Sequence, residues 1–393
     1  MRCGLHEQLT MRRFRGPGAL HLSSRRAPTL KLIIQPGDGV ERLIKGIRKA
    51  KKSVEIVIFR FDRGEIERAL IDAVERGVFV HALVAFTNRG GEENLRKLEK
   101  RFLASGITVA RTAGDLVRYH GKMMIVDRKE LYVTAFNFTH LDMERTRSFG
   151  LITRNPKLVG EAVKLFEADT KRQVYTAGNS KFLVSPVNAR KELTKFIKSA
   201  KKELLIYDPK ISDRAMLRLL EDRRKAGVEF RVIGKVSHKH LTSCELSRMR
   251  LHTRTIVRDR THVFIGSQSL RQLELDARRE IGVVLRDGAA VKDILRTFEE
   301  DWAASYGAGL EEKAEKRAAP ARKTAKKLAR LVAKNANVDP AVKKVVKAIS
   351  EAADGNRNGK KTRERVKEVI HKVVEDTAKD AAEKAVKVVA EAS

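Results

Sequence analysis

The chain has 393 residues, 42% of them hydrophobic, which is enough to bury one or two sizeable cores. A formal net charge of +33 rules out a predominantly acidic surface and favours polyanionic partners such as nucleic acid or anionic membranes. Two cysteines, Cys3 and Cys244, are too few for a disulfide framework, and no apolar run reaches the roughly 18 residues that would predict a transmembrane helix. We therefore expect a cytoplasmic protein, with peripheral contact with an anionic membrane left open.

Residues 1–29 form a basic segment that includes Arg12, Arg13 and Arg15 and lacks the apolar core of a signal peptide. We expect this leader to be disordered, although a start codon assigned too early would also explain it.

From residue 30 onward the chain is composed of two similar halves, 30–175 and 181–306. Matching apolar, Ala-Lys-Lys and Gly-Val segments recur at one constant separation, at 32–36 and 182–186, at 50–52 and 200–202, and at 77–78 and 227–228. We call this separation the repeat offset. Internal similarity of this kind indicates that one structural unit is used twice.

Each half alternates predicted strands and helices. Residues 54–59 are rich in β-branched side chains and predict a strand, and residues 78–84 predict another. Between them, Ile66, Ala69, Leu70 and Ala73 have the spacing of an amphipathic helix. The alternation predicts an α/β fold in which helices cover a parallel or mixed sheet.

The first chemical motif is formed by His120, Lys122 and Asp127, which surround the apolar run 123–126. Side chains two residues apart share a face of a strand, so His120 and Lys122 are expected to point the same way. Lysine supplies a compact positive charge for phosphoryl oxygens, and histidine can act as nucleophile or proton shuttle near neutral pH. The pattern therefore favours phosphate chemistry.

The same pattern returns in the second half as His252, Arg254 and Asp259. Ten positions beyond each aspartate stand Asn137 and Ser269, and Ser267 precedes the latter by two positions. We call the separation of the two histidines the histidine offset. It is shorter than the repeat offset, so the first half has about 18 additional residues. We expect these to form the helical stretch around Leu95, Leu98 and Phe102.

In these residues the sequence resembles the phospholipase D superfamily, which is marked by two H-x-K-x4-D motifs, each followed by a Gly-Ser-x-Asn-like segment and an acidic residue. The acid of the second half is Glu280, whereas Ser148 stands at the matching position of the first half. The resemblance implies two similar α/β halves, packed about a pseudo-two-fold axis, that bring both motifs to one central cleft.

The resemblance also implies a mechanism. One histidine attacks phosphorus to give a phosphohistidine, and the other protonates the leaving alcohol. Lys122 and Arg254 would hold the non-bridging oxygens, while Asn137, Ser267 and Ser269 could add neutral donors. The two cationic side chains would do the work of a metal ion, so neither metal nor cofactor is expected.

Two points bear on the roles of the two histidines. In the family the first histidine is usually the nucleophile, and His120 stands in the motif that keeps its lysine. In the family, the residue at position 280 commonly binds the histidine of its own half and favours the imidazolium. We therefore expect His120 to be the nucleophile and His252 the general acid, with Asp142 or Glu144 replacing the acid absent at Ser148. Asp127 and Asp259 are expected to be structural, each holding a strand end or a turn.

Three functions remain open. The first, which we follow, is a phospholipase D-like phosphodiesterase that hydrolyses or transfers phospholipids, in the manner of phospholipases D and cardiolipin synthases. The second is a nuclease or DNA end-processing enzyme, which the charge of +33 favours. The third is a non-catalytic protein that binds nucleic acid or membrane, which the changes at Ser148, Arg254 and Ser269 keep open.

Residues 307–393 differ in composition from the rest of the chain. They contain no Phe, Trp or Tyr and carry 22 basic and 13 acidic residues, a net charge of +9. Apolar residues recur at helical spacing, for example at Val342, Val345, Val346 and Ile349, so we expect a helical tail rich in Lys and Ala. It would serve either as a solvated or oligomerising appendage or as a polyanion-binding tail.

Overall fold

A computed structural model describes residues 30–87, 92–238 and 240–306, together with residue 347. The chain divides into two compact units, Met1–Tyr306 and Gly307–Ser393, and every element named below belongs to the first. The expected leader 1–29 and almost all of the expected tail lie outside the described residues.

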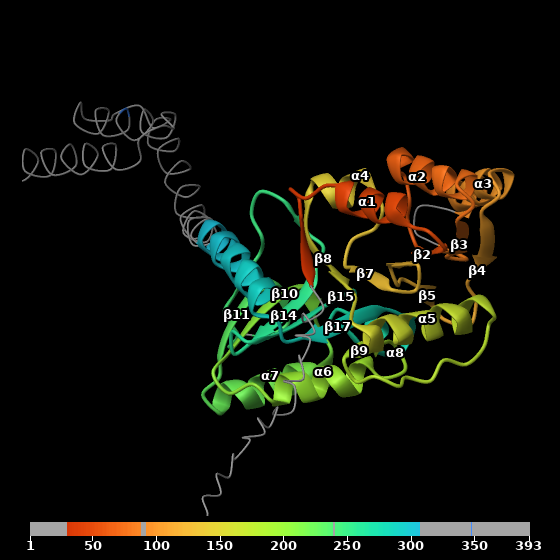
Figure 1. Cartoon of the computed structure of the whole chain (residues 1–393). Helices are drawn as coiled ribbons and strands as arrows, with labels where there is room; N and C mark the ends of the chain where they lie inside the picture. Colours follow the sequence, from red (N-terminus) through yellow and green to blue (C-terminus); the bar gives the residue numbers. More distant parts are fainter. Residues whose placement is uncertain (1–29, 88–91, 239, 307–346, 348–393) are drawn as a thin grey trace, which may run out of the picture. The chain divides into compact units, whose positions relative to one another are not determined.

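The first half contains eight strands and five helices within its described residues (Figure 1): β1 (Lys31–Gln35), α1 (Glu41–Lys49), β2 (Ser53–Ile58), α2 (Gly64–Glu75), β3 (Phe79–Val84), α3 (Glu92–Ala104), β4 (Thr108–Arg111), β5 (Arg118–Tyr119), β6 (Met123–Val126), β7 (Glu130–Thr134), α4 (His140–Glu144), β8 (Thr146–Thr153) and α5 (Pro156–Thr170).

The second half contains the following elements in chain order: β9 (Phe182–Val184), α6 (Ala189–Lys198), β10 (Glu203–Ile211), α7 (Arg214–Lys225), β11 (Glu229–Val236), β12 (Ser243–Cys244), β13 (Arg250–Leu251), β14 (Arg254–Arg258), β15 (His262–Gly266), α8 (Gln272–Asp276), β16 (Arg278–Arg279) and β17 (Ile281–Leu285). A helix over residues 288–306 ends the described part of this unit.

The two large sheets have the same strand order. One runs β1-β8-β7-β6-β2-β3-β4, with β13 also paired to β8, and the other runs β9-β17-β15-β14-β10-β11-β12. Strands β2 and β3 are parallel, as are β10 and β11, whereas β6 and β14 are antiparallel to their neighbours. The sheets are therefore mixed, and the α/β prediction is confirmed.

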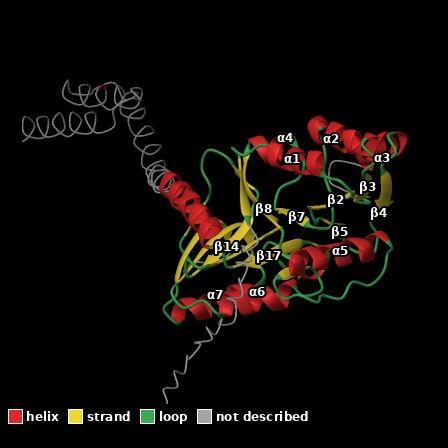
Figure 2. Cartoon of the chain, viewed as in Figure 1, coloured by secondary structure: helices red, strands yellow, loops and turns green. Residues whose placement is uncertain are grey.

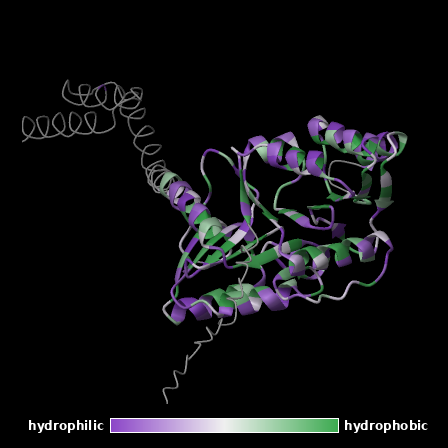
Figure 3. Cartoon of the chain, in the orientation of Figure 1, coloured by the Kyte–Doolittle hydropathy of each residue, from purple (hydrophilic) through white to green (hydrophobic). Residues whose placement is uncertain are grey.

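Apolar side chains form three packing layers. Helices α1, α2 and α3 cover one face of the first sheet, and α6 and α7 cover one face of the second (Figure 2). Between the sheets lies a shared core built from both halves, including Phe149, Tyr207 and Phe298. The strands are predominantly hydrophobic and the outer helices carry hydrophilic outer surfaces (Figure 3), as amphipathic patterning requires.

The additional residues of the first half form α3. It connects β3 to β4, whereas residues 237–242 alone connect the equivalent strands β11 and β12. So short a connection leaves no room for a helix of that length, and the position expected from the sequence is confirmed. None of the helices in the described ranges is long and apolar enough to cross a membrane.

Asp127 and Asp259 occupy equivalent tight turns, with φ of 51° and 50°. Each carboxylate accepts main-chain N–H bonds from three successive residues that lead into a neighbouring strand, 51–53 for Asp127 and 201–203 for Asp259, at 2.7–3.2 Å. The two aspartates therefore fasten one end of β6 to β2 and of β14 to β10. Both lie at the end of the strand opposite to the histidine.

Candidate active site

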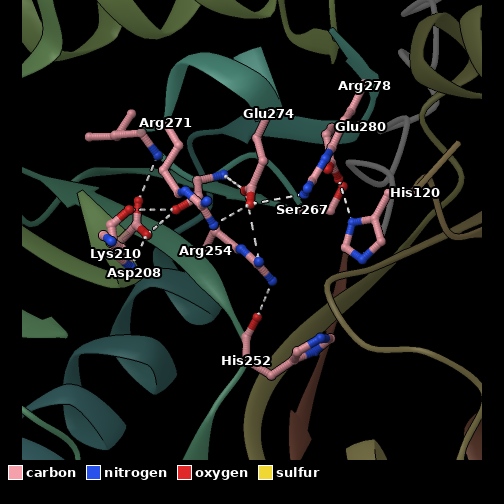
Figure 4. Close-up of polar contacts among 12 residues, drawn as sticks. His120, Asp208, Lys210, His252, Arg254, Ser267, Arg271, Glu274, Arg278 and Glu280 are labelled. Atoms are coloured by element: carbon pink, nitrogen blue, oxygen red, sulfur yellow. Dashed lines mark hydrogen bonds and ion pairs between the residues drawn. The ribbon is translucent and has the colours of Figure 1, made fainter. Parts of the chain in front are cut away.

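Both histidines follow short strands that cross from one half to the other. Strand β5 pairs with β16, and β13 pairs with β8. The main-chain N–H of His120 donates to the carbonyl of Arg279 at 2.7 Å, and that of His252 donates to the carbonyl of Arg147 at 3.0 Å. Each histidine is thus held by the opposite half, which brings the two motifs into one buried site (Figure 4).

The basic residue of each motif folds back over its own histidine. Lys122 Nζ donates to the carbonyl oxygen of His120 at 2.6 Å, and Arg254 Nη1 donates to that of His252 at 2.7 Å. Both side chains are buried. Arginine at position 254 therefore makes the contact that lysine makes at position 122, and both residues keep further N–H groups for a ligand.

The structure corrects the expected partner of Glu280. Its Oε2 accepts a hydrogen bond at 2.8 Å from Nδ1 of His120, the histidine of the opposite half, and not from His252 (Figure 4). The physical reason is the pairing of β16 with β5, which carries the following residue, Glu280, across to the first motif. The expectation that Glu280 serves His252 was wrong, so Glu280 gives no support to His252 as the general acid.

Asp142, one of the two acids considered for the first half, lies beside His252. Its Oδ2 is 3.5 Å from His252 Nδ1, a contact that becomes an ion pair when the imidazole is protonated. Asp142 also accepts a bond from Arg250 Nη1 at 2.9 Å. Glu144, the other acid considered, pairs with Arg63 instead. Asp142 is therefore the carboxylate that faces the second histidine.

The three expected neutral donors are already engaged. Asn137 Nδ2 donates to Asp142 Oδ2 at 2.6 Å, which leaves its second amide proton for a ligand. Ser267 Oγ donates to a main-chain carbonyl of β17 at 3.3 Å, and Ser269 Oγ donates to Asp208. A hydroxyl has a single proton, so these contacts give both serines a role in shaping the loop.

Comparison with known proteins identifies the family. A sequence-family model described as "Cardiolipin synthase, PLD-like domain" matches residues 43–170 and 193–302, which together are more than half of the chain. The chain belongs to the phospholipase D superfamily. A mitochondrial cardiolipin hydrolase of Danio rerio is 30% identical over 135 residues, which cover 32% of this chain and 56% of that protein. The match thus spans little more than half the length of that curated relative.

Two solved structures show the same fold as this phospholipase D superfamily member. A polyphosphate kinase of Porphyromonas gingivalis superposes with a TM-score of 0.59 at 20% identity, over 69% of this chain and 50% of that one. A phosphatidylserine synthase of Haemophilus influenzae superposes with a TM-score of 0.54 at 11% identity, over 70% of this chain and 85% of that one. At these identities the likeness extends to the fold alone.

Burial governs the protonation of the two histidines of this superfamily member. It lowers the pKa of His120 well below the usual value, and the positive charges of Lys122 and Arg254 lower it further. Burial lowers the pKa of His252 as well, although Asp142 opposes the shift. The charges of Arg254 and Lys122 thus act on the histidine of the opposite half as well as on their own, which is the electrostatic signature of one shared site.

The pKa values of Lys122 and Glu280 are shifted as well. Burial lowers the pKa of Lys122 to about 7, with Glu280 opposing the shift. Burial raises the pKa of Glu280, which Lys122 and Arg254 oppose. A hydrogen bond from Nδ1–H of neutral His120 to the Glu280 carboxylate leaves the Nε2 lone pair free, as a nucleophile requires.

Two further residues of the site, Glu274 and Phe59, were not identified from the sequence. Glu274 Oε2 accepts from the N–H of Ser269 at 2.8 Å, and its Oε1 accepts from Arg278 at 3.2 Å. Glu274 follows Asp142 by the histidine offset, and this signal could have identified it. Phe59, whose ring centroid lies 4.6 Å from that of His120, has no counterpart in the repeat that would have identified it.

Buried polar atoms without a hydrogen-bond partner occur at this site among the described residues. They include Asn137 Oδ1, His252 Nδ1, Arg254 Nε and Glu280 Oε1. Such atoms cost free energy unless a ligand or water satisfies them, so their position is typical of a binding site. Among the residues that the structure describes, no group of three or more His, Cys, Asp and Glu is arranged to hold a metal ion.

Proposed function

We propose that this chain is a phosphodiesterase that hydrolyses or transfers phospholipid phosphodiesters through a phosphohistidine, without a metal ion. The observation that carries the proposal is the pair of buried imidazoles in one site, with Glu280 on His120 and Asp142 beside His252. A two-step displacement at phosphorus requires a nucleophile, an acid–base group and positive charge for the phosphoryl oxygens. Two imidazoles with different carboxylate partners, next to two cations, can supply these.

In the first step, Nε2 of His120 attacks phosphorus and forms the P–N bond as the P–O bond to the leaving group breaks. His252, as its imidazolium, transfers a proton to the departing alkoxide, so the alcohol leaves neutral. Asp142 favours the imidazolium, because it opposes the lowering of the His252 pKa by burial. An anionic substrate adds to that effect.

In the second step, neutral His252 accepts a proton from water or from a second alcohol, whose oxygen attacks phosphorus and breaks the P–N bond. Lys122, Arg254 and the free amide proton of Asn137 would bind the non-bridging oxygens, where negative charge accumulates. Water gives hydrolysis and an alcohol gives transfer.

We also propose that residues 30–175 and 181–306 are the two units of the duplication, related by a pseudo-two-fold axis with the shared site as its central cleft. The support is the equivalent strand order of the two sheets and the reciprocal contacts of the two histidines.

The choice of a phospholipid substrate has its support in the description of the matching family and in the 30% identity to a cardiolipin hydrolase. A second candidate function is cleavage of nucleic-acid phosphodiesters. The net charge of +33 favours it, because phosphate contacts dominate affinity for nucleic acid.

The decisive experiment compares both substrate classes with purified protein in EDTA. Vesicles containing phosphatidylglycerol or cardiolipin and fluorescent single- and double-stranded DNA are incubated with wild type and with His120→Ala. We expect headgroup release or transfer from the vesicles, and a phosphohistidine that survives alkaline denaturation in wild type and is absent from His120→Ala.

DNA cleavage that depends on His120 would show that the substrate is nucleic acid and not phospholipid. Activity that EDTA removes, or that His120→Ala retains in full, would contradict the mechanism itself.

A further inference from the structure

Two buried arginines, Arg147 and Arg279, occupy equivalent positions, directly before Ser148 and Glu280, and are separated by the histidine offset. Their main-chain carbonyls are the acceptors that hold the N–H groups of His252 and His120. The backbone of each arginine therefore contacts the backbone of one histidine, so contacts that hold an arginine in place bear on the position of that histidine.

The side chain of Arg147 forms an ion pair with the second half and a hydrogen bond with its own half. Its Nε and Nη2 donate to the two carboxylate oxygens of Asp301 at 2.6 and 3.0 Å, and Nη1 donates to the carbonyl of Gln35 at 3.1 Å. The hydroxyl of Tyr207 donates to Asp301 Oδ2 at 2.7 Å. We call Arg147, Asp301 and Tyr207 the His252 anchor.

The side chain of Arg279 likewise forms an ion pair with the first half and a hydrogen bond with its own half. Its Nη2 donates to Asp169 Oδ1 at 3.0 Å, and Nη1 donates to the carbonyl of Ser185 at 3.3 Å. The hydroxyl of Tyr119 donates to Asp169 Oδ2 at 2.6 Å. We call Arg279, Asp169 and Tyr119 the His120 anchor.

The arginine, the aspartate and the main-chain acceptor of one anchor recur in the other, whereas Tyr119 and Tyr207 are not at equivalent positions. Asp169 and Asp301 are separated by the histidine offset, as the arginines are, and Gln35 and Ser185 are separated by the repeat offset. The two aspartates and the two arginines are all buried, so each ion pair is shielded from water. In each anchor the ion pair between arginine and aspartate thus joins the two halves, and the tyrosine holds the aspartate from within its own half.

We propose that Asp301 and Tyr207, through Arg147, are positioning residues for His252, and that Asp169 and Tyr119, through Arg279, are positioning residues for His120. This inference rests on the proposed function, in which His120 is the nucleophile and His252 the general acid. Neither aspartate contacts His120 or His252 by a hydrogen bond or ion pair in the described residues, so each acts through its arginine and the carbonyl of that arginine.

The two roles give the anchors different kinetic signatures. In kcat/KM, which reports the step that forms the phosphohistidine, misplacing the general acid slows only substrates whose leaving group must be protonated, whereas misplacing the nucleophile slows all of them. The test uses Asp301→Asn and Asp169→Asn as a matched pair, with Tyr207→Phe and Tyr119→Phe as milder variants that keep both ion pairs. One substrate is bis(p-nitrophenyl) phosphate, whose phenolate leaves without being protonated. The other is phosphatidylglycerol in vesicles, whose leaving alcohol must be protonated.

We expect Asp301→Asn to lower kcat/KM on vesicles by about 100-fold more than on the aryl diester, since small displacements of catalytic groups have effects of that order. Tyr207→Phe should change the ratio in the same direction by about tenfold or less. Asp169→Asn and Tyr119→Phe should lower kcat/KM by the same factor on both substrates. Equal loss on both substrates for both aspartate variants would reduce the anchors to structural contacts and overturn the proposal.

A readout independent of turnover separates this inference from the proposed function. Imidazole ¹⁵N resonances, assigned with His120→Ala and His252→Ala, should shift for His252 in Asp301→Asn and for His120 in Asp169→Asn. If wild type cleaves neither substrate but these shifts are selective, the proposed function fails while the positioning stands. Shifts of both histidines in both variants, or of neither, would refute the positioning. Should an aspartate variant not fold, its tyrosine counterpart decides.

Discussion

Glu280 and Ser148 occupy equivalent positions and give the two histidines different surroundings. Glu280 orients His120 through a direct bond at 2.8 Å, while Nδ1 of His252 faces Asp142 at 3.5 Å. Ser148 Oγ is buried and has no hydrogen-bond partner among the described residues. The site is therefore asymmetric, and its asymmetry agrees with different tasks for the two imidazoles.

Glu280→Gln is expected to lower kcat/KM by about 100-fold or more, because the amide can present its N–H₂ to Nδ1 and no longer fixes the tautomer that frees Nε2. The matched control is Ser148→Ala at the equivalent position, which should retain activity within about threefold because it removes no hydrogen bond. Steady-state assays on vesicles measure both. A mild effect of Glu280→Gln beside a large effect of Ser148→Ala would reverse our assignment of nucleophile and acid.

The pKa of Lys122, about 7, predicts the pH dependence of the reaction. Lysine is charged below its pKa, so positive charge at the non-bridging oxygens is present at acidic pH and lost as the pH rises through 7. The proton on His252 is lost at lower pH, because its pKa lies well below the usual value. The slope of log kcat/KM against pH should therefore steepen from about −1 to about −2 near pH 7.

Lys122→Arg provides the control for this profile, since arginine keeps its charge and Arg254 already makes the equivalent contact. The variant should keep a slope of about −1 above pH 7 even where its rate is lower. If log kcat/KM steepens near pH 7 in Lys122→Arg as it does in wild type, a group other than Lys122 causes the change in slope.

Among the elements, the turns after β6 and β14 carry a prediction about stability. The carboxylate of Asp127 accepts three main-chain N–H bonds, and these outweigh burial, so the pKa of Asp127 lies below its usual value. Asp127→Asn should lower the free energy of unfolding by about 1–3 kcal/mol and leave kcat unchanged, because the turn is at the far end of β6 from His120.

Urea denaturation across pH measures this prediction. A carboxylate whose pKa is lower in the folded than in the unfolded state stabilises the folded protein at pH values above the unfolded-state pKa. This stabilisation is lost as the pH falls through the folded-state pKa. The difference between wild type and Asp127→Asn should therefore shrink below about pH 4. A difference that persists unchanged at lower pH would show that the charge of Asp127 is not its source.

The elements themselves could be predicted because their patterns are local. The apolar spacing at Ile66, Ala69, Leu70 and Ala73 marks α2, and all four side chains are buried in the outer core. The pairing of β5 and of β13 with strands of the opposite half could not be predicted, since strands of two residues show no periodicity in the sequence. That pairing decides which carboxylate meets which histidine, which is why the partner of Glu280 was assigned wrongly while the two motifs themselves were recognised.

At the scale of the whole molecule, the proposed duplication accounts both for what the sequence predicted and for what it did not. Two motifs in register indicated one site, and the difference between the repeat offset and the histidine offset locates α3 before the first motif. The anchors at Arg147 and Arg279 obey the same offsets, yet arginine and aspartate are common on surfaces. Burial, which the sequence does not display, distinguishes the anchor residues from the remaining charges.

The distribution of charge over the chain leads to the last prediction. Of the net charge of +33, residues 307–393 carry +9, so most of the attraction for polyanions belongs to residues 1–306. Removing 307–393 should weaken binding to DNA or anionic vesicles and reduce the slope of log K against log salt concentration by about a quarter, because that slope counts the phosphate contacts made by cations. Turnover should remain, since every proposed catalytic group precedes residue 281. Fluorescence anisotropy over a salt series measures the slope. An unchanged slope would mean that residues 307–393 do not bind polyanions. A slope close to zero would mean that they make most of the phosphate contacts, although they carry the smaller part of the charge.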